Sequence, residues 1–138
     1  MHMITYISDY KGDKAQIDKN LSDIITKAQQ KNKALGVTGV LFYLNGQFLQ
    51  IIEGEDETIK NLMAEITIDD RHTNVSILID EKVEQRGFKD FNMDTFNLEK
   101  DTDFNRDKIE KLTENFKQNF IPRTDILIHF YKSLLAKV

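Results

Sequence analysis

The sequence has no cysteine and no long hydrophobic run. The absence of cysteine excludes disulfide bonds, thiolate nucleophiles and cysteine-ligated metal sites. No apolar stretch approaches the roughly 20 residues that a membrane-spanning helix needs. The N-terminus also lacks the basic segment and apolar run of a signal peptide. We therefore expect a soluble, cytoplasmic protein that does not act in a membrane.

Positive charge is also scarce. Lysine and arginine total 19 against 23 aspartates and glutamates, which gives a net charge of -4. No basic run is long enough to form a nucleic-acid-binding patch, so we expect no nucleic-acid partner. The length of 138 residues suits one domain with its own core, and 40% hydrophobic and 30% charged residues are typical of a globular protein.

The histidines and carboxylates do not suggest a metal site. The three histidines, His2, His72 and His129, are scattered along the chain. The acidic pairs at residues 69–70 and at 101 and 103 are typical of solvated turns. Metal sites need ligands that converge at close spacing, so we expect no metal centre.

Hydrophobic periodicity predicts a strand and then a helix at the start of the chain. Residues 3–8 alternate as a strand does, with Ile4, Tyr6 and Ser8 on one face. A helix follows that begins at Asp13 or Asp18 and ends near Gly36, a typical position for a C-terminal cap. Its apolar face carries Ile17, Leu21, Ile24, Ile25 and Ala28.

The next segments predict a hairpin, a second helix and two more strands. Residues 37–43 and 47–53 flank Asn45-Gly46, the strongest short-range hairpin signal. A second amphipathic helix begins near Glu55 or Asp56, and residues 75–79 and 91–96 are short strands. This order predicts an α+β fold, a ferredoxin-like βαββαββ sheet with two helices on one face. The second helix presents Ile59, Leu62, Met63 and Ile66.

The remaining residues predict helices that cover the other face of the sheet. An apolar stripe precedes Pro122, and Thr124 or Asp125 can cap a last helix. The polar stretch at residues 99–103 is a predicted linker, so we expect one domain at 1–98 and a C-terminal helical extension at 99–138. The stripes contain Ile109, Leu112, Phe116 and Phe120, and then Ile128, Tyr131, Leu134 and Leu135.

The strand at 47–53 has a glutamine in its hydrophobic half. Phe48, Gln50 and Ile52 share one face, because strand side chains alternate with a period of 2. A carboxamide that points into a core must find hydrogen-bond partners or it destabilises the fold. Gln50 is therefore either a satisfied core polar group or the point at which a polar ligand meets the protein.

Tyr6, Asn32, Gln50 and Met93 are candidate functional residues as a set. Each has a purely structural alternative when it is taken singly: a half-buried tyrosine, a helix-end asparagine, a core amide and a flexible gap filler. The interpretation of a functional site rests on their occurrence together. The order of elements favours Tyr6 and Gln50 on separate strands that both face the helices.

Five stretches of this sequence resemble the BLUF domain, a family of flavin-binding blue-light sensors. The resemblance covers about residues 3–98. Its most specific part is a Gly-Val-Thr-Gly strand followed by Phe-Leu-Gln and Glu-Gly. The stretches are residues 4–8 (Ile-Thr-Tyr-Ile-Ser), 32–43, 46–54 (Gly-Gln-Phe-Leu-Gln-Ile-Ile-Glu-Gly), 69–72 (Asp-Asp-Arg-His) and 86–93 (Arg-Gly-Phe-Lys-Asp-Phe-Asn-Met).

The resemblance implies a non-covalently bound flavin, namely FAD, with FMN or riboflavin as alternatives, and a light-driven switch that is not an enzyme. It implies that Tyr6 gives an electron and a proton to the excited flavin. It implies that Gln50 links the tyrosine to the flavin edge, that Asn32 binds the polar edge of the ring and that Met93 passes the change to the sheet. The implied cofactor-binding residues also include Ile24, Ile25, Ala28, Ile66, Arg71 and His72, although a turn and ordinary packing are alternatives for these.

One departure from the family concerns aromatic residues. Many relatives carry tryptophan two residues before the methionine, whereas this chain has Phe91 there and no tryptophan at all. Because tryptophan competes as an electron donor, its absence should remove a side pathway. The last forty or so residues contain no recognisable effector, so we expect a homo-oligomer that signals to a separate effector protein through its C-terminal helices.

Two other functions remain open from sequence alone. One is a flavin-free interaction module that keeps the fold. The other is an enzyme on a ferredoxin-like sheet, such as an acylphosphatase, for which residues 35–40 resemble an anion loop. That enzyme needs an arginine close to the loop, and no arginine precedes Arg71. The colour of the purified protein distinguishes the first alternative from a flavin sensor, because only a flavin-bound protein is yellow.

Overall fold

The structure is a computed structural model that describes residues 1–70, 72–99, 110, 111, 114 and 132. The chain divides into two compact units, Met1–Asn97 and Leu98–Val138. The first unit contains every strand and helix discussed below. The apolar stripes predicted for the C-terminal helices fall mainly outside the described residues, as does the predicted packing of those helices on the sheet.

The first unit has the predicted order of strands and helices. The elements are β1 (His2–Tyr10), a short 3-10 helix (Lys14–Gln16), α1 (Ile17–Leu35), β2 (Thr38–Leu44), β3 (Gln47–Gly54), α2 (Asp56–Thr67), β4 (His72–Lys82) and β5 (Asn92–Asn97). The fourth strand is longer than the predicted residues 75–79. Backbone pairing with β1 runs from His2 opposite Lys82 to Tyr10 opposite His72, and this pairing extends the strand through polar residues.

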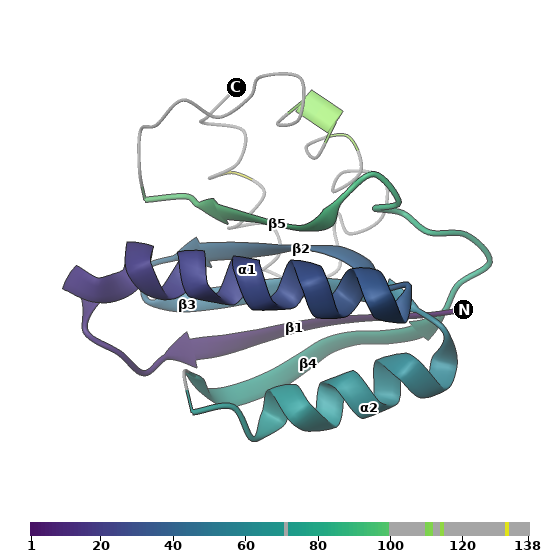
Figure 1. Cartoon of the computed structure of the whole chain (residues 1–138), viewed down its shortest axis with the longest axis horizontal. Coiled ribbons are helices and arrows are strands. Elements are labelled where there is room, and N and C mark those ends of the chain that lie inside the picture. The colour runs from purple at the N-terminus through teal and green to yellow at the C-terminus, as the bar shows by residue number, and fades with distance from the viewer. Residues whose placement is uncertain (71, 100–109, 112–113, 115–131, 133–138) are drawn as a thin grey trace. The chain divides into compact units, whose positions relative to one another are not determined.

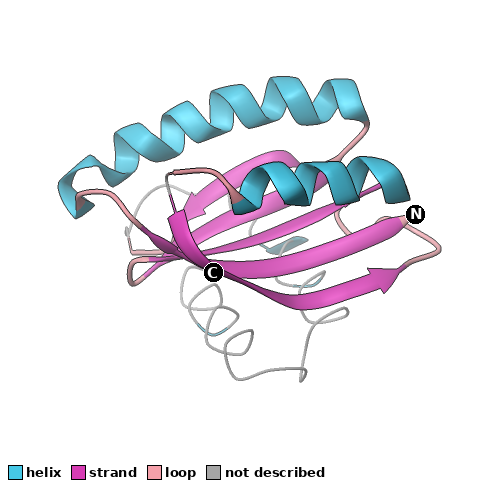
Figure 2. Cartoon of the chain, turned by 90° about the horizontal axis from the view of Figure 1, so that it is seen from below, coloured by secondary structure: helices cyan, strands magenta, loops and turns pink. Residues whose placement is uncertain are grey.

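The five strands form one mixed sheet in the order β4-β1-β3-β2-β5. Neighbouring strands are antiparallel except at one edge, where β5 runs parallel to β2. Both helices lie over the same face of this sheet, as Figure 1 and Figure 2 show from two directions. The predicted ferredoxin-like α+β fold is confirmed for this unit.

Local signals in the sequence explain where α1 begins and ends. The Asp13 side chain accepts a hydrogen bond from the Ala15 amide at 3.0 Å and caps the short 3-10 turn that leads into the helix. Gly36 ends the helix in a left-handed conformation with φ 69°, as predicted. Asn32, predicted as a helix-end residue, is followed in α1 only by residues 33–35 before the Gly36 cap. Asn32 therefore projects from the last helical turn.

The β2–β3 turn sets the register of the central strands. Asn45 and Gly46 both have positive φ, 52° and 76°, which is the backbone of a two-residue type I′ hairpin turn. Leu44 then pairs with Gln47, and each residue along the two strands follows from that pair. The same register on the other side of β3 places Tyr6 of β1 directly opposite Gln50.

Two separate clusters of buried residues lie between the sheet and the helices. One cluster packs against α2 and the other against α1, so each helix has its own apolar support. The α2 cluster contains Ile4, Tyr6, Val37, Ile52, Ile59, Leu62, Met63 and Met93. The α1 cluster contains Ile17, Leu21, Leu41, Tyr43 and Phe48.

Candidate functional site

A chain of side-chain hydrogen bonds crosses the helix-covered face of the sheet. The Tyr6 hydroxyl donates to Gln50 Oε1, and Gln50 Nε2 donates to Met93 Sδ at 3.0 Å. The three residues come from β1, β3 and β5, and they are 2%, 7% and 0% exposed. Both ends of the buried amide are therefore occupied, the oxygen by a phenol and the nitrogen by a weak thioether acceptor.

Met93 reaches Gln50 because β5 bulges at this residue. Gly39 pairs with Asn92 and the next residue of β2, Val40, pairs with Asp94, so Met93 is the extra residue. Its φ of 54° lies in the left-handed region, which is rare for methionine. Gly39 leaves room for the side chain, because a Cβ there would lie 3.2 Å from Met93 Cε and 1.9 Å from the Ile51 carbonyl oxygen.

A cavity of about 270 Å³ lies between α1 and α2 with the Tyr6–Gln50 pair in its wall. Its volume is near the lower end of small-molecule sites, roughly 300 Å³. Apolar side chains from both helices and the sheet form much of the lining, and a few polar groups converge on it. The apolar lining residues are Ile24, Ala28, Leu41, Phe48, Leu62 and Ile66.

Asn32 lines this cavity with an unused amide. The residue is only 3% exposed. Its backbone carbonyl accepts from the amides of Gly36 and Val37, but its side chain has no hydrogen-bond partner among the described residues. Because Asn32 is part of the cavity lining, a ligand with a polar edge could hydrogen-bond to its amide.

His72 lies beside Tyr6 in the same cavity. Its Nε2 is 2.6 Å from the Ile66 carbonyl oxygen and its Nδ1 is 2.8 Å from Ser8 Oγ. A carbonyl can only accept, so Nε2 carries a proton and donates to it, and Nδ1 forms the second hydrogen bond with the serine hydroxyl. The imidazole contacts Tyr6 edge-on, with ring centroids 6.1 Å apart. His72 therefore ties the C-terminal end of α2 to β1, next to the tyrosine.

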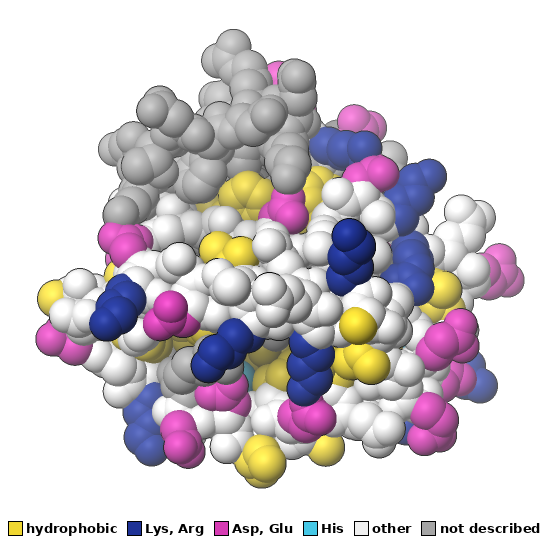
Figure 3. Space-filling model, viewed as in Figure 1, with side chains coloured by type: hydrophobic (Ala, Val, Ile, Leu, Met, Phe, Trp, Pro, Cys, Tyr) yellow, Lys and Arg dark blue, Asp and Glu magenta, His cyan; other side chains and the backbone are white. Residues whose placement is uncertain are grey.

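Charged residues form the rim of the cavity, and the sequence analysis did not identify them. Lys27 and Lys31 of α1 and Glu65 of α2 are exposed and line the opening, and Lys31 forms an ion pair with Glu65 across it. Figure 3 shows charged side chains around the gap between the helices, with hydrophobic atoms beneath them. Helical spacing could have indicated the lysines, because Ile24, Lys27 and Lys31 follow an i, i+3, i+7 pattern.

The structure brings together most of the predicted site residues. Of these, Tyr6, Ile24, Ala28, Asn32, Gln50, Ile66 and His72 line the cavity. Met93 lies behind Gln50, and Ile25 is half-buried but is not part of the lining. Arg71 lies outside the described residues. Asp69, which was interpreted as part of a solvated turn, also lines the cavity.

The part of the chain that the structure describes contains neither a metal-binding cluster nor a membrane-spanning helix. No group of three histidines or carboxylates there is arranged to hold a metal ion. None of the helices there is long and apolar enough to span a membrane.

The fold and the site define a ferredoxin-like domain with a largely apolar cavity between its two helices, next to a buried tyrosine–glutamine pair. A family model described as "Sensors of blue-light using FAD" matches residues 1–94. The chain belongs to this family, BLUF. Its members are blue-light-sensing flavin photoreceptors.

Individual relatives agree with this assignment. The chain is 35% identical over 85 residues to photoactivated adenylate cyclase subunit beta of Euglena longa, covering 62% of this chain and 10% of that protein. It resembles the structure of a bacterial light-regulated adenylyl cyclase at 35% identity and a TM-score of 0.65, covering 86% and 34% of the two chains. BlsA in its ground state matches at 26% identity and a TM-score of 0.70, covering 98% and 88%. The chain spans about a tenth of the length of the first curated relatives that it matches.

Proposed function

We propose that this protein is a blue-light photoreceptor that binds a flavin non-covalently, in which light drives electron and proton transfer from Tyr6 and a rearrangement of the Gln50 hydrogen bonds. The observation that best supports this proposal is the buried chain of hydrogen bonds from Tyr6 through Gln50 to Met93 beside the cavity. The protein acts as a switch without turnover, because the electron and the proton return to Tyr6.

The residues around the cavity fit a flavin. A flavin ring has flat apolar faces, which suit Ile24 and Ala28 on one wall and Leu62 and Ile66 on the other. Its polar edge needs hydrogen-bond donors and acceptors, and the unpartnered Asn32 amide supplies both. We propose that His72, Arg71 and the half-buried Ile25 contribute around this core of contacts. FAD is the proposed cofactor, with FMN and riboflavin as alternatives.

The bound flavin supplies blue-light absorption and an excited state that accepts an electron. A phenol that loses an electron becomes strongly acidic, so the Tyr6 proton must move with it. In the structure this hydroxyl already donates to Gln50 Oε1, so Gln50 would take the proton at Oε1 and would give up a proton from Nε2 towards the reduced cofactor. Both residues are buried, so this hydrogen bond is already in place before light arrives.

Glutamine can change its partners without a net change of charge. Its carboxamide has a donor end and an acceptor end, and rotation or tautomerisation reverses which neighbour each end serves. In the present arrangement the donor end serves only the Met93 thioether, a weak acceptor. A rearranged Gln50 would release Met93 and offer a hydrogen bond elsewhere in the cavity. Met93 would carry this change to β5.

An absorption spectrum of the purified protein before and after a blue flash tests the proposal. We expect a flavin spectrum that shifts slightly to the red and relaxes in the dark, and acid precipitation should release the flavin because it is not covalently attached. A colourless protein that cannot be reconstituted with FAD, FMN or riboflavin would contradict the proposal. That result would favour a flavin-free interaction module on the same fold.

We propose that the output goes to a separate effector protein through the C-terminal segment of a homo-oligomer. The support is the apolar stripes that the sequence predicts in residues 109–120 and 128–135, a pattern typical of helices that pack on a partner surface. Light would change subunit packing by favouring one of two arrangements. Sedimentation in the dark and under blue light should differ. Identical sedimentation together with identical partner binding would contradict this part of the proposal.

A further inference from the structure

Glu53 is a buried carboxylate outside the cavity with several hydrogen-bond donors. It is 1% exposed at the end of β3. Its Oε1 accepts from the Phe88 amide at 2.7 Å and from Thr38 Oγ1 at 3.0 Å, and its Oε2 accepts from the Gly87 amide at 2.9 Å. Two of these donors belong to the β4–β5 connection. Glu53 therefore fastens this connection to β3.

Arg86 of the same connection binds three segments of the chain. Its Nη2 donates to the Gly36 carbonyl at 2.6 Å, and its Nη1 donates to Thr38 Oγ1 at 2.9 Å and to the Glu53 carbonyl at 3.0 Å. The acceptors come from the C-terminal cap of α1, from β2 and from β3. Only a guanidinium has donors on two nitrogens in a fixed fork that can reach such a set.

The Thr38 hydroxyl connects the two charged groups. It accepts from Arg86 and donates to Glu53, so the polarity of the chain is fixed. The guanidinium and the carboxylate do not form a direct ion pair among the described residues. We call Arg86, Thr38 and Glu53 the clasp.

The clasp lies between two parts of the proposed switch. On one side it binds the Gly36 carbonyl, and the amide of Gly36 bonds to the carbonyl of Asn32. On the other side Glu53 accepts a hydrogen bond from the backbone amide of Phe88. The Phe88 side chain is buried, and its ring packs against Phe91 with the ring centroids 6.3 Å apart. Met93 follows two residues after Phe91.

The backbone between the clasp and the bulge is also bonded. The Phe91 carbonyl accepts from the Gly39 amide at 3.0 Å, directly before the bulge that turns Met93 into the left-handed region. A bulge of this kind persists only where its surroundings hold it. The clasp is the polar anchor at the other end of the same short segment, in the loop that Figure 1 shows leading into β5.

We infer that Arg86, Thr38 and Glu53 form a positioning device that holds Met93 against Gln50 and thereby couples the cavity to β5. This inference rests on the proposed function for its role in signalling, but not for its effect on Met93. Without the clasp, the β4–β5 connection loses its anchor, the bulge relaxes and the thioether leaves Gln50 Nε2. The flavin-facing residues stay in place.

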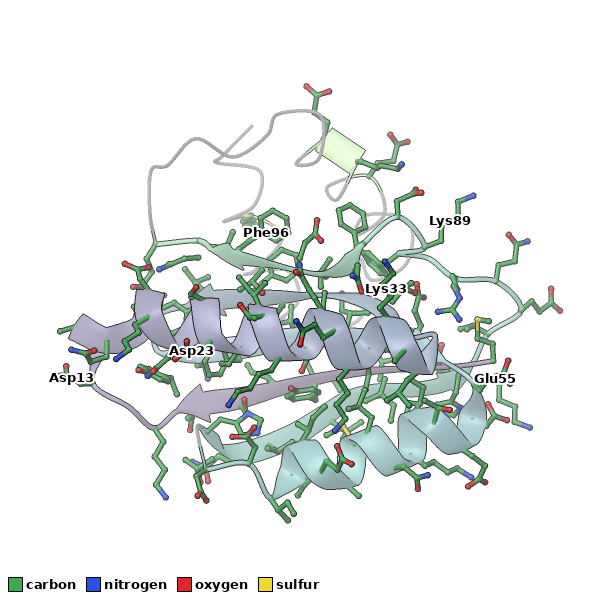
Figure 4. The ribbon with its side chains drawn as sticks, viewed as in Figure 1. Asp13, Asp23, Lys33, Glu55, Lys89 and Phe96 are labelled. Atoms are coloured by element: carbon green, nitrogen blue, oxygen red, sulfur yellow. The ribbon has the colours of Figure 1, made fainter. Side chains whose placement is uncertain are left out.

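Methyl NMR of the protein in the dark tests the positioning role. The Met93 methyl resonance, assigned by its loss in Met93→Leu, should move in Arg86→Ala, Arg86→Lys and Thr38→Val. It should stay in place in Lys89→Ala, which removes an exposed cation from the same connection; Lys89 points away from the sheet (Figure 4). Arg86→Lys keeps the positive charge but lacks the planar fork of donors. An unchanged Met93 resonance in the folded variants would overturn the inference.

Thr38→Val keeps the test decisive if Arg86→Ala does not fold, because it removes only the hydroxyl that joins the two charged groups. A purely structural clasp would lower the free energy of unfolding without moving the Met93 resonance. Amide exchange gives an independent measure: the amides of β5 should exchange about fivefold faster in the clasp variants than in Lys89→Ala. Equal exchange rates would also overturn the inference.

The light-dependent arm separates this inference from the proposed function. The clasp variants should keep a red shift while the light-induced change in β5 amide exchange falls about fivefold. A full light-induced change in β5 of these variants would contradict the coupling. Absence of a red shift in the unmodified protein would instead contradict the proposed function, and the dark measurements would still decide whether the clasp positions Met93.

Discussion

Tyr6 and Gln50 lie directly opposite each other in the antiparallel β1–β3 ladder, and the phenol donates to the amide oxygen. Opposite residues on one sheet face have Cβ atoms about 5 Å apart, so two long side chains can meet without backbone distortion. The pair therefore follows from strand register. An Asn-Gly turn fixes the register of β3 against β2, and β1 pairs on the other edge of β3.

Replacing Gln50 by leucine should abolish the light-induced red shift and leave flavin bound. Leucine keeps much of the volume but has neither a donor nor an acceptor. The Tyr6 hydroxyl then loses its hydrogen bond to Gln50, which should lower the free energy of unfolding by about 1–3 kcal/mol. Flash absorption spectroscopy and denaturant titration measure the two effects. Gln47→Leu is the matched control, because Gln47 lies on the same strand outside the cavity. A red shift that persists in Gln50→Leu would remove the glutamine from the mechanism.

Replacing Asn32 by alanine should weaken flavin binding by about tenfold. The lost hydrogen bond to a polar ligand edge is worth about 1.4 kcal/mol. Because the amide has no hydrogen-bond partner among the described residues, the variant should retain its stability without flavin. Fluorescence titration with FMN and FAD measures the affinity. Gln30→Ala, an exposed amide on the same helix, should bind as the unmodified protein does. Equal affinities in both variants would show that Asn32 does not contact the cofactor.

Glycine at position 39 should be far more sensitive to substitution than glycine at position 36. A Cβ at Gly39 would lie 1.9 Å from the Ile51 carbonyl oxygen, so Gly39→Ala must separate β2 from β3 or shift the Met93 bulge. We expect a loss of at least about 3 kcal/mol in unfolding free energy. Gly36→Ala meets no atom within 4 Å and should lose only about 1 kcal/mol from its positive φ. Similar losses in the two variants would contradict the close approach at Gly39.

The Lys31–Glu65 ion pair should retain flavin in the cavity without stabilising the fold. Both side chains are about half exposed, at 49% and 56%, so solvent screens the pair and its stability effect should be below about 0.5 kcal/mol. Because the pair bridges α1 and α2 at the rim, Glu65→Gln should speed flavin release about twofold to threefold. Stopped-flow displacement measures this rate, and 1 M salt should remove the difference. Release that does not respond to the substitution would place the exit path elsewhere.

The sequence predicted the parts of the site that depend on local pattern. Strand alternation identified Tyr6 and Gln50 as inward-facing, helical spacing identified Ile24 and Ala28, and Gly36 predicted the end of α1. These features arise within one element or one turn. The predicted ends of strands were less accurate, because β4 follows its backbone partner and not its own hydrophobic pattern.

Features that depend on pairing between distant segments could not be derived from pattern. The parallel pairing of β5 with β2 and the bulge at Met93 arise from a close approach at Gly39. The clasp joins Arg86 to Gly36, fifty positions away in the sequence, and a buried glutamate next to a glycine gives no local signal of its partners. Helical spacing places Lys27 and Lys31 on the face of Ile24, but it does not show that Lys31 pairs with Glu65 of the other helix.

The light-minus-dark absorption spectrum of Tyr6→Phe, measured beside Tyr10→Phe, tests the central claim most directly. Both tyrosines lie on β1, but only Tyr6 lines the cavity, and Tyr10 instead bonds to Asn20 and to the Asp13 carbonyl. We predict a reversible red shift in the unmodified protein and in Tyr10→Phe, and none in Tyr6→Phe with flavin still bound. A red shift of normal size in Tyr6→Phe would contradict the account, because light would then act without the tyrosine.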